Sequence, residues 1–288
     1  MKSFGLYLIY FASSALSFIF CTPTESTPPS EQSKRPPNII VILSDDLGYA
    51  DLGYTGAKDL KTPHIDALVR EGIKFTDAYV TASVCSPSRA GLITGRHQAR
   101  WGHDSNWSDF ALPQEEVTLG QRLKECGYKT SIVGKWHLGR AIYRDPRDDE
   151  VKSVRGFDEI FITRHNATYF EEEYLDSRGS ARFSKLTDKS LYTPNVCAQR
   201  GADFIRRNQN QPFFLFLPLN SVHENFYAPD RLEAPQKYLD QVQNIQNKRR
   251  RLMAAMVTAL DDAVGTIMST LEETGLDHNT LVIFTNDN

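Results

Sequence analysis

Short apolar runs of strand length recur along this chain. Residues 38–43, 212–217 and 281–284 are almost entirely apolar. Such runs predict strands that are covered on both faces, as in a parallel sheet. Further strands are predicted at 75–80 and 128–133, where polar residues interrupt the apolar ones.

Segments between these strands show helical spacing. In the longest, apolar residues recur every three or four positions over 252–271, and Gly275 suits the position after a helix. Shorter helices are predicted over 118–126, from Pro87 to Gly95, and from the Thr-Pro pairs at Thr62 and Thr193. Strands covered on both faces and separated by helices predict an α/β fold, with a mostly parallel central sheet and helices on both faces.

Composition adds two limits. The chain has 288 residues, of which 40% are hydrophobic, and a formal net charge of −3. This is enough apolar material for one large globular domain. Basic and acidic residues are nearly balanced, so no charge excess indicates a nucleic-acid partner.

The amino-terminal segment differs from the rest of the chain. Lys2 precedes an apolar run over 4–20, which predicts a signal peptide over residues 1–20 and export to the periplasm or the outer surface. The polar segment 21–36 predicts a flexible tether. The folded domain is therefore expected over 37–288.

Cys21, at the end of the apolar run, leaves two alternatives open. In a bacterial lipoprotein this cysteine would carry a lipid that tethers the protein to a membrane. Phe20 is bulkier than the small residue usual at that cleavage site. The other alternative is cleavage near Ala15 without a lipid.

Two further cysteines remain. If Cys21 and Cys85 are processed, only Cys126 and Cys197 can pair, and nothing in the sequence requires them to do so. Cys126 lies at core spacing with the leucines of the 118–126 helix, so a buried thiol is predicted there.

The segment from Val84 to Arg96 concentrates the most chemistry. It reads Val-Cys-Ser-Pro-Ser-Arg-Ala-Gly-Leu-Ile-Thr-Gly-Arg. Cys85 is expected at a helix N-terminus, where free backbone N–H groups and the helix dipole favour an anion. Arg89 follows on the same helical face, and its guanidinium can bind a tetrahedral oxyanion.

This segment resembles the signature of the type I sulfatases, members of the alkaline phosphatase superfamily in which the cysteine is oxidised to formylglycine. The match comprises Cys85-Ser86-Pro87-Ser88-Arg89 and Thr94-Gly95. A buried structural thiol that begins an ordinary helix is the alternative. A cysteine-dependent phosphatase loop is excluded, because it needs an arginine six residues after the cysteine, where this chain has Gly91.

Acidic residues follow the first predicted strand and the last. Asp45 and Asp46 stand where open α/β sheets bind ligands. Adjacent carboxylates repel each other unless a cation lies between them, and a solvated turn is the alternative. The resemblance implies that Asp45, Asp46, Asp287 and Asn288, together with the modified Cys85, hold the metal ion. Oxygen ligands suit calcium, the usual metal of the family, or magnesium, rather than zinc.

The resemblance also assigns roles to three basic residues and one acid. It implies that Asp287 and His137 take protons from the hydrated formylglycine. It implies further that His223 assists the leaving oxygen and that Lys135 bridges the formylglycine and the sulfate. Asn225 stands where the family usually has proline, so the loop behind His223 departs from the family pattern.

Two charged segments are predicted to be solvated. Residues 141–190 are charged and irregular, and they predict loops that shape a substrate entrance. The cluster Lys248-Arg249-Arg250-Arg251 precedes the longest helix, and it is interpreted as a solvated face rather than an anion site.

The activity that the resemblance implies is hydrolysis of sulfate esters, with sulfated carbohydrates as the expected substrates. A formylglycine-generating or radical maturation enzyme is an expected partner. Two alternatives stay open: a phosphate or phosphonate ester hydrolase of the same superfamily, and an inactive truncated domain that binds a glycan. Family members continue past the position of Asn288 with a glycine, a catalytic lysine and a small carboxyl-terminal subdomain, so this chain is expected to be a fragment.

Overall fold

The structure is a computed structural model. It describes residues 35–106, 112–138, 154–163, 169–170, 173–177, 183–185, 188, 190–225, 228 and 230–288. Cys21 and the predicted signal peptide lie outside the described residues, as does most of the predicted tether. Residues Arg35–Asn288 form one compact unit.

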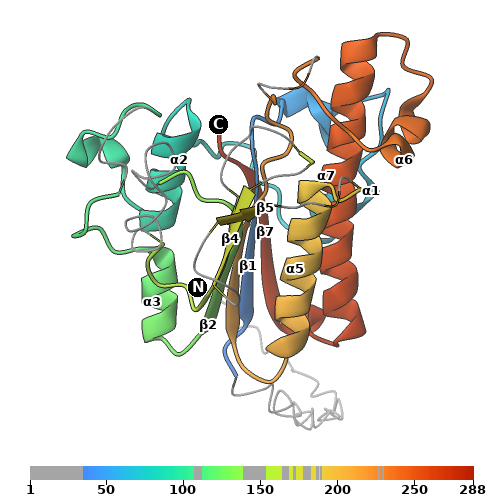
Figure 1. The fold of residues 1–288 in the computed structure, drawn as a ribbon. Helices are drawn as coiled ribbons and strands as arrows, with labels where there is room; N and C mark the ends of the chain where they lie inside the picture. The colour runs from blue at the N-terminus through green and yellow to red at the C-terminus, as the bar shows by residue number, and fades with distance from the viewer. Residues whose placement is uncertain are drawn as a thin grey trace, which may run out of the picture. The chain divides into compact units, whose positions relative to one another are not determined.

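The described sheet has seven strands in the order β5-β4-β3-β2-β6-β1-β7 (Figure 1). They are β1 (Asn38–Ser44), β2 (Lys129–Lys135), β3 (Glu159–Thr163), β4 (Glu173–Asp176), β5 (Phe183–Lys185), β6 (Phe213–Pro218) and β7 (Thr280–Asn286). Neighbouring strands pair in parallel along the series β3, β2, β6, β1 and β7. At the other edge, β4 pairs antiparallel with β3, and β5 pairs antiparallel with β4. The predicted mostly parallel sheet is confirmed.

Helices cover both faces of the sheet. In Figure 1, α2 and α3 lie on one face, and α1, α5 and α7 lie on the other. The α-helices are α1 (Pro63–Glu71), α2 (Cys85–Thr94), α3 (Leu119–Glu125), α5 (Thr193–Arg207), α6 (Gln236–Leu239) and α7 (Lys248–Glu273). Short 3-10 turns are η1 (Tyr49–Asp51), η2 (Gly53–Thr55), η3 (Gln98–Trp101), η5 (Asp240–Val242) and η6 (Asp277–Asn279).

Alternate residues of the central strands enter two separate cores. Ile40 and Ile42 of β1 pack with α5 and α7, whereas Val41 and Leu43 pack on the opposite face with α2. Because side chains alternate between covered faces, almost every position of the strand must be apolar. This is why the 38–43 run is continuous in the sequence.

Helix α7 is long and apolar enough to cross a membrane, by length and composition alone. However, 61% of its most apolar window is buried inside the protein. Leu260, Val264 and Leu271 are fully buried in the core beside the sheet. We therefore interpret α7 as a core helix; no other helix in the described part of the chain meets the same criterion.

The predicted strand at 75–80 was wrong. Phe75 and Tyr79 are 76% and 87% exposed, and the Thr76 hydroxyl donates to Asp77 (2.7 Å) in a bend. A strand needs a neighbour to accept and donate its backbone hydrogen bonds. None of the described strands pairs with this segment.

The prediction that residues 141–190 are mainly solvated loops was also wrong in part. This region contains β3, β4 and β5, which extend the sheet beyond β2. The apolar part of β3 is only Ile160-Phe161-Ile162, all buried. So short a run among charged residues gave too weak a pattern to be recognised as a strand.

The cysteine predictions had mixed outcomes. Cys126 is exposed rather than buried, because α3 ends at Glu125 and Cys126 is the C-cap that follows it. Cys197 is buried in the core that contains α5. The thiol of Cys126 is free, as is that of Cys85.

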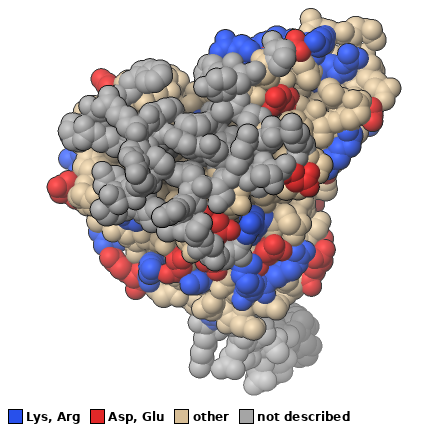
Figure 2. All heavy atoms as spheres, in the orientation of Figure 1, with Lys and Arg blue, Asp and Glu red and all other residues tan. Residues whose placement is uncertain are grey.

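The basic cluster at the beginning of α7 is paired with acidic residues. Lys248 Nζ lies 2.7 Å from Asp230, and Arg249 pairs with Glu224. These two cations are more than half exposed, as predicted for a solvated face, whereas Arg250 is half-buried against Asp59 (2.7 Å). Charges of both signs are also interspersed over the described surface drawn in Figure 2.

Candidate active site

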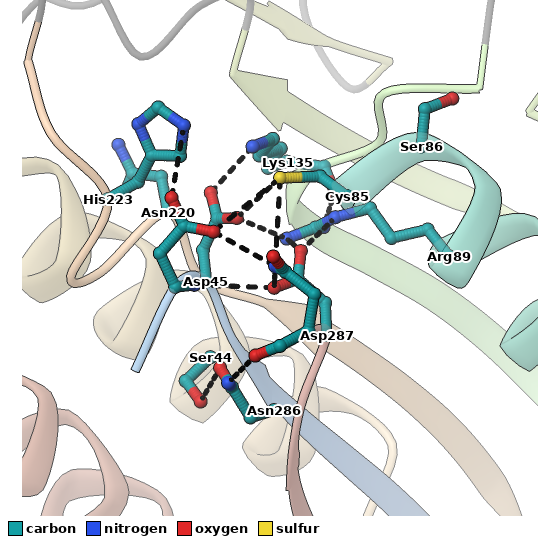
Figure 3. A network of polar contacts seen from close by, with 12 residues as sticks. Ser44, Asp45, Cys85, Ser86, Arg89, Lys135, Asn220, His223, Asn286 and Asp287 are labelled. Carbon is teal, nitrogen blue, oxygen red and sulfur yellow. Dashed lines mark hydrogen bonds and ion pairs between the residues drawn. The ribbon is translucent and has the colours of Figure 1, made fainter. Parts of the chain in front are cut away.

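The polar residues singled out in the sequence come together at one edge of the sheet (Figure 3). β1, β2, β6 and β7 run parallel, so their carboxyl ends share this edge. Asp45 follows β1, Lys135 ends β2, and Asp287 follows β7. The first turn of α2 brings Cys85 to the same place.

Asn286 aligns the ends of β1 and β7, which are followed by Asp45 and Asp287. It lies opposite Ser44 in the β1–β7 register, and its Oδ1 accepts hydrogen bonds from Ser44 Oγ (2.9 Å) and Leu47 N (3.1 Å). Asp287 N donates to Ser44 O (3.1 Å). The carboxylates that follow each strand are therefore held side by side.

The turn that carries His223 is fastened to β1. Asp45 N donates to Ser221 O (2.7 Å), and Val222 N donates back to Asp45 O (2.6 Å). The hydroxyl of Tyr169, which is fully buried, lies 2.6 Å from Asn220 O and 2.7 Å from His223 O. Two backbone bonds and one side chain thus hold this turn beside the acidic pair.

The thiol of Cys85 lies against the acidic residues. Its Sγ is 3.3 Å from Asp45 Oδ1, 3.8 Å from Asp46 Oδ1 and 3.8 Å from Asn288 Nδ2. α2 begins at Cys85 and ends before Gly95, which has the left-handed φ of 64° common after a helix. The helix therefore starts two residues before Pro87, and the predicted N-terminal placement of Cys85 is correct.

Two buried cations balance part of the negative charge. Lys135 Nζ lies 2.6 Å from Asp45 Oδ2. Arg89 contacts Asp287 Oδ2 through Nε (2.9 Å) and its terminal nitrogen (2.8 Å), and it lies 3.5 Å from Asp45. Arg89 also donates to Lys135 O (2.8 Å). Its donors therefore hold protein groups, whereas the sequence suggested that they bind the substrate anion.

Burial and the neighbouring charges set opposite protonation states for Asp45 and Cys85. Burial alone would raise the pKa of Asp45, but Lys135 and Arg89 lower this pKa to about 2. Burial raises the pKa of the Cys85 thiol to about 12. At neutral pH the carboxyl group is thus ionised and the thiol is protonated.

Two further groups have shifted pKa values. Burial, with the positive charges of Lys135 and Arg89 adding to it, lowers the pKa of His137 well below its ordinary value. The imidazole is therefore neutral at neutral pH. Burial raises the pKa of Asp287 against the opposing effect of Arg89.

The ring orientation of His223 follows from one hydrogen bond. Its Nδ1 lies 2.6 Å from Glu224 O, a carbonyl that can only accept, so Nδ1 carries a proton. Nε2 lies 3.4 Å from Asp46 Oδ2. This second nitrogen faces the acidic cluster.

The donor set suits a divalent cation. Ligand atoms of Asp45, Asp46, Cys85 and Asp287 all lie within 4.8 Å of one another. Among the described residues, the three carboxylates meet two buried cations, which leaves negative charge for a metal ion to neutralise. Asn288 Nδ2 lies 2.9 Å from Asp46 Oδ1, and rotating the amide by half a turn would present its oxygen instead. Oxygen ligands of this kind fit calcium or magnesium.

Sequence reasoning missed the residues that support this site. Asn286 stands as a polar residue at the end of an apolar run, a weak signal that it makes specific hydrogen bonds. Tyr169 gave no signal, because its partners are backbone carbonyls about fifty residues away in sequence. Ser86 was noted only as part of a motif, although its hydroxyl donates to His137 O (2.7 Å).

Comparisons with known proteins agree with this geometry. The family model described as Sulfatase matches residues 37–288. Arylsulfatase J of Mus musculus is 34% identical over 266 residues, which cover 88% of this chain and 42% of that protein. N-acetylgalactosamine-6-sulfatase of Canis lupus familiaris is 32% identical over 280 residues, with 88% and 50% covered.

Solved structures agree as well. The structure titled "Crystal structure of Ps i-CgsB" superposes with a TM-score of 0.76 at 31% sequence identity, over 88% of this chain and 59% of that chain. The chain thus spans about half the length of the curated relatives it matches.

Proposed function

The chain belongs to the sulfatase family, and on that premise we propose that it hydrolyses sulfate esters by means of a formylglycine made from Cys85. One observation carries the proposal. Cys85 Sγ lies 3.3 Å from Asp45, at the first residue of α2 and beside an oxygen-rich cluster. A sulfate bound there meets the helix N-terminus and the cation that the cluster would hold.

The unmodified thiol does not suit this reaction. With its pKa raised to about 12, Cys85 stays protonated at neutral pH, and the thiolate is the nucleophilic form of cysteine. Formylglycine, when present, supplies hydroxyl groups from its hydrated form. The surrounding residues then have to hold the sulfate and move protons.

The acidic cluster has a separate task. Asp45, Asp46, Asp287 and Asn288 would hold calcium, with magnesium as the alternative. Such a cation supplies the positive charge that offsets repulsion between the sulfate oxygens and a nucleophile. Arg89 contributes indirectly, since it pairs with Asp287 and Asp45 and keeps their carboxylates in place.

Proton transfer falls to groups with suitable protonation states. Asp287 is proposed to accept a proton from the hydrated formylglycine, because its carboxylate oxygen lies within 4.8 Å of the Cys85 sulfur. His137 is neutral, so a ring nitrogen can accept a second proton. His223, whose Nε2 faces Asp46 at 3.4 Å, is proposed to assist the leaving alcohol oxygen.

Lys135 is proposed to bind the sulfate. Its Nζ is already oriented by Asp45 at 2.6 Å and retains further N–H donors. An ammonium group held in this way can contact a sulfate oxygen without first being ordered, which limits the entropic cost of binding.

The proposed substrates are sulfated carbohydrates, because one matched relative is named N-acetylgalactosamine-6-sulfatase. The proposed setting is outside the cytoplasm, in the periplasm or at the outer surface, with the amino-terminal segment as signal peptide. Membrane tethering by a lipid at Cys21 and contact with a formylglycine-forming maturation enzyme are further parts of this proposal.

Mass spectrometry of the Cys85 peptide, from protein made in its native host, tests the modification. A peptide lighter than the thiol form by the mass difference between cysteine and formylglycine is expected. Only unmodified thiol at this position would remove the proposed mechanism.

Kinetics on matched esters test the reaction. Sulfate and phosphate monoesters of the same alcohol should differ in kcat/KM in favour of the sulfate, and C85A should lose turnover of both. Faster hydrolysis of the phosphate ester would instead favour a phosphatase of the same superfamily.

A further inference from the structure

Two side chains of α2 hold the backbone that carries Lys135 and His137. Arg89 donates to Lys135 O (2.8 Å), and Ser86 Oγ donates to His137 O (2.7 Å). Ser86 and Arg89 are three residues apart and lie on one side of the helix. The helix that begins at Cys85 therefore holds the backbone of Lys135 and His137 in place.

Ser86 is itself held by His103. The Ser86 hydroxyl has a single proton, and His137 O can only accept, so that proton goes to the carbonyl. His103 Nε2, 2.9 Å from Ser86 Oγ, must then carry the hydrogen and donate it. A chain of hydrogen bonds runs from His103 through Ser86 to His137 O.

The residues of this hydrogen-bonded series are buried, so their side chains have little conformational freedom. Ser86 is 2% exposed and His103 is 1% exposed. Ser86 N donates to Asn106 Oδ1 (2.9 Å), which fixes the first turn of α2. In such surroundings consecutive hydrogen bonds polarise and strengthen one another.

His137 needs this support. Its φ is 62°, in the left-handed region that a residue with a Cβ seldom adopts. Such a conformation is unfavourable for a residue other than glycine and persists only where neighbours impose it. Without the bond to its carbonyl, the residue can relax to an ordinary backbone conformation and take its imidazole away from Lys135, Arg89 and Asp287, whose charges act on it.

We propose that Ser86 and His103 are positioning residues, which hold the His137 imidazole where it can accept a proton beside Cys85. The inference rests on the proposed function for the role of His137. The position itself can be observed without any turnover. Neither Ser86 nor His103 needs to touch the substrate.

The kinetic test compares S86A with S86T. Loss of a residue that orients a catalytic group typically costs about 10–100-fold in activity, so S86A should lose this much in kcat, with KM unchanged. S86T keeps the hydroxyl, so its kcat should be close to that of the wild type. Rates are divided by the fraction of formylglycine found by mass spectrometry, because Ser86 lies within the modified motif.

The structural test follows the histidine rings by NMR in protein labelled with carbon-13 histidine. The chain has seven histidines, and H137N identifies the His137 signal by its loss. S86A should shift or broaden this signal, and S86T should leave it in place. If S86A fails to fold, H103A and H103Q make the same comparison, because glutamine keeps an N–H donor.

The two proposals fail in distinguishable ways. A wild-type protein that carries formylglycine but turns over no sulfate ester would overturn the proposed function, and the NMR comparison would still decide the positioning role. An unmoved His137 signal in S86A, or an unchanged kcat per formylglycine, would overturn the positioning role alone.

Discussion

Two clusters of charged residues in this protein use similar pairs but differ in burial. At the sheet edge, Arg89, Asp45 and Asp287 have side chains at most 1% exposed. At the beginning of α7, Arg250 and Asp59 are 29% and 38% exposed. The same chemistry is thus placed once in the interior and once at the surface.

The comparison shows where charge is costly. Removing ions from water is expensive, and a buried group that loses its partner stays uncompensated. A surface pair that is broken returns to solvent at little cost. The sheet-edge cluster is therefore a demanding arrangement to maintain, as expected for a site that binds a cation and an anion, whereas the α7 cluster joins two segments of the fold.

R89M should give the largest effect. The substitution leaves Asp45 and Asp287 buried without their shared cation, a loss of about 3–5 kcal/mol in the free energy of unfolding. For a domain of this size the corresponding fall in Tm is roughly 6–20 °C. Thermal unfolding followed by circular dichroism measures it.

R122A is the matched control for this prediction. Arg122 pairs with Glu125 at 3.2 Å, and both side chains are more than 60% exposed, so its loss should barely move Tm. Equal effects of R89M and R122A would contradict the comparison.

Calcium binding at the sheet-edge cluster should have the second largest effect on the free energy of unfolding. A ligand at about 100 times its Kd adds about 2.7 kcal/mol to the free energy of unfolding. Protein freed of metal with a chelator should therefore unfold at a lower temperature and recover with calcium. In a D46N/D287N variant the calcium response should vanish, and a persistent response would place the ion elsewhere.

The fall in the free energy of unfolding at acidic pH should reflect the lowered pKa of Asp45. Its pKa is lowered from 3.8 to about 2 on folding, so its contribution is complete above pH 4 and is lost as pH falls through about 2. That contribution is about 2 kcal/mol. Denaturant unfolding of metal-free protein between pH 4 and pH 2 should show a shallower loss of stability for D45N than for wild type. Identical slopes for D45N and wild type would show that Lys135 and Arg89 do not lower the pKa of Asp45.

R250A should give the smallest effect. Arg250 bonds Asp59 through two nitrogens (2.7 and 2.8 Å) and also pairs with Asp51, but all three side chains reach solvent. The free energy of unfolding should fall by about 1 kcal/mol or less, and added salt should reduce the difference. A loss as large as that of R89M would remove the distinction between the two clusters.

Much of the fold was predictable, because burial on both faces leaves a mark in the sequence. The apolar runs at 38–43 and 212–217 correspond to β1 and β6. Helix α7 follows from its apolar spacing, although it begins at Lys248, before the first leucine of that pattern. The predictions failed where the apolar pattern was short or ambiguous, as for β3 and for the exposed segment 75–80.

The candidate site was predictable in its members but not in its contacts. Asp45, Cys85, Lys135 and His223 were recognised by residue type, by position after a strand or by resemblance, and the structure brings them together. Arg89 was expected to bind an anion, and it instead pairs with Asp287, 198 positions away. Nothing in the local sequence of α2 indicates that partner.

The sequence by itself determined most of the segments that form strands and helices, and which chemical groups end them, because periodicity and capping depend on residues a few positions apart. The tertiary structure decided which of those groups touch. The order of strands places β1 between β6 and β7, although these lie far apart along the chain. The pairing of Arg89 and the chain from His103 to His137 exist only after distant segments have packed.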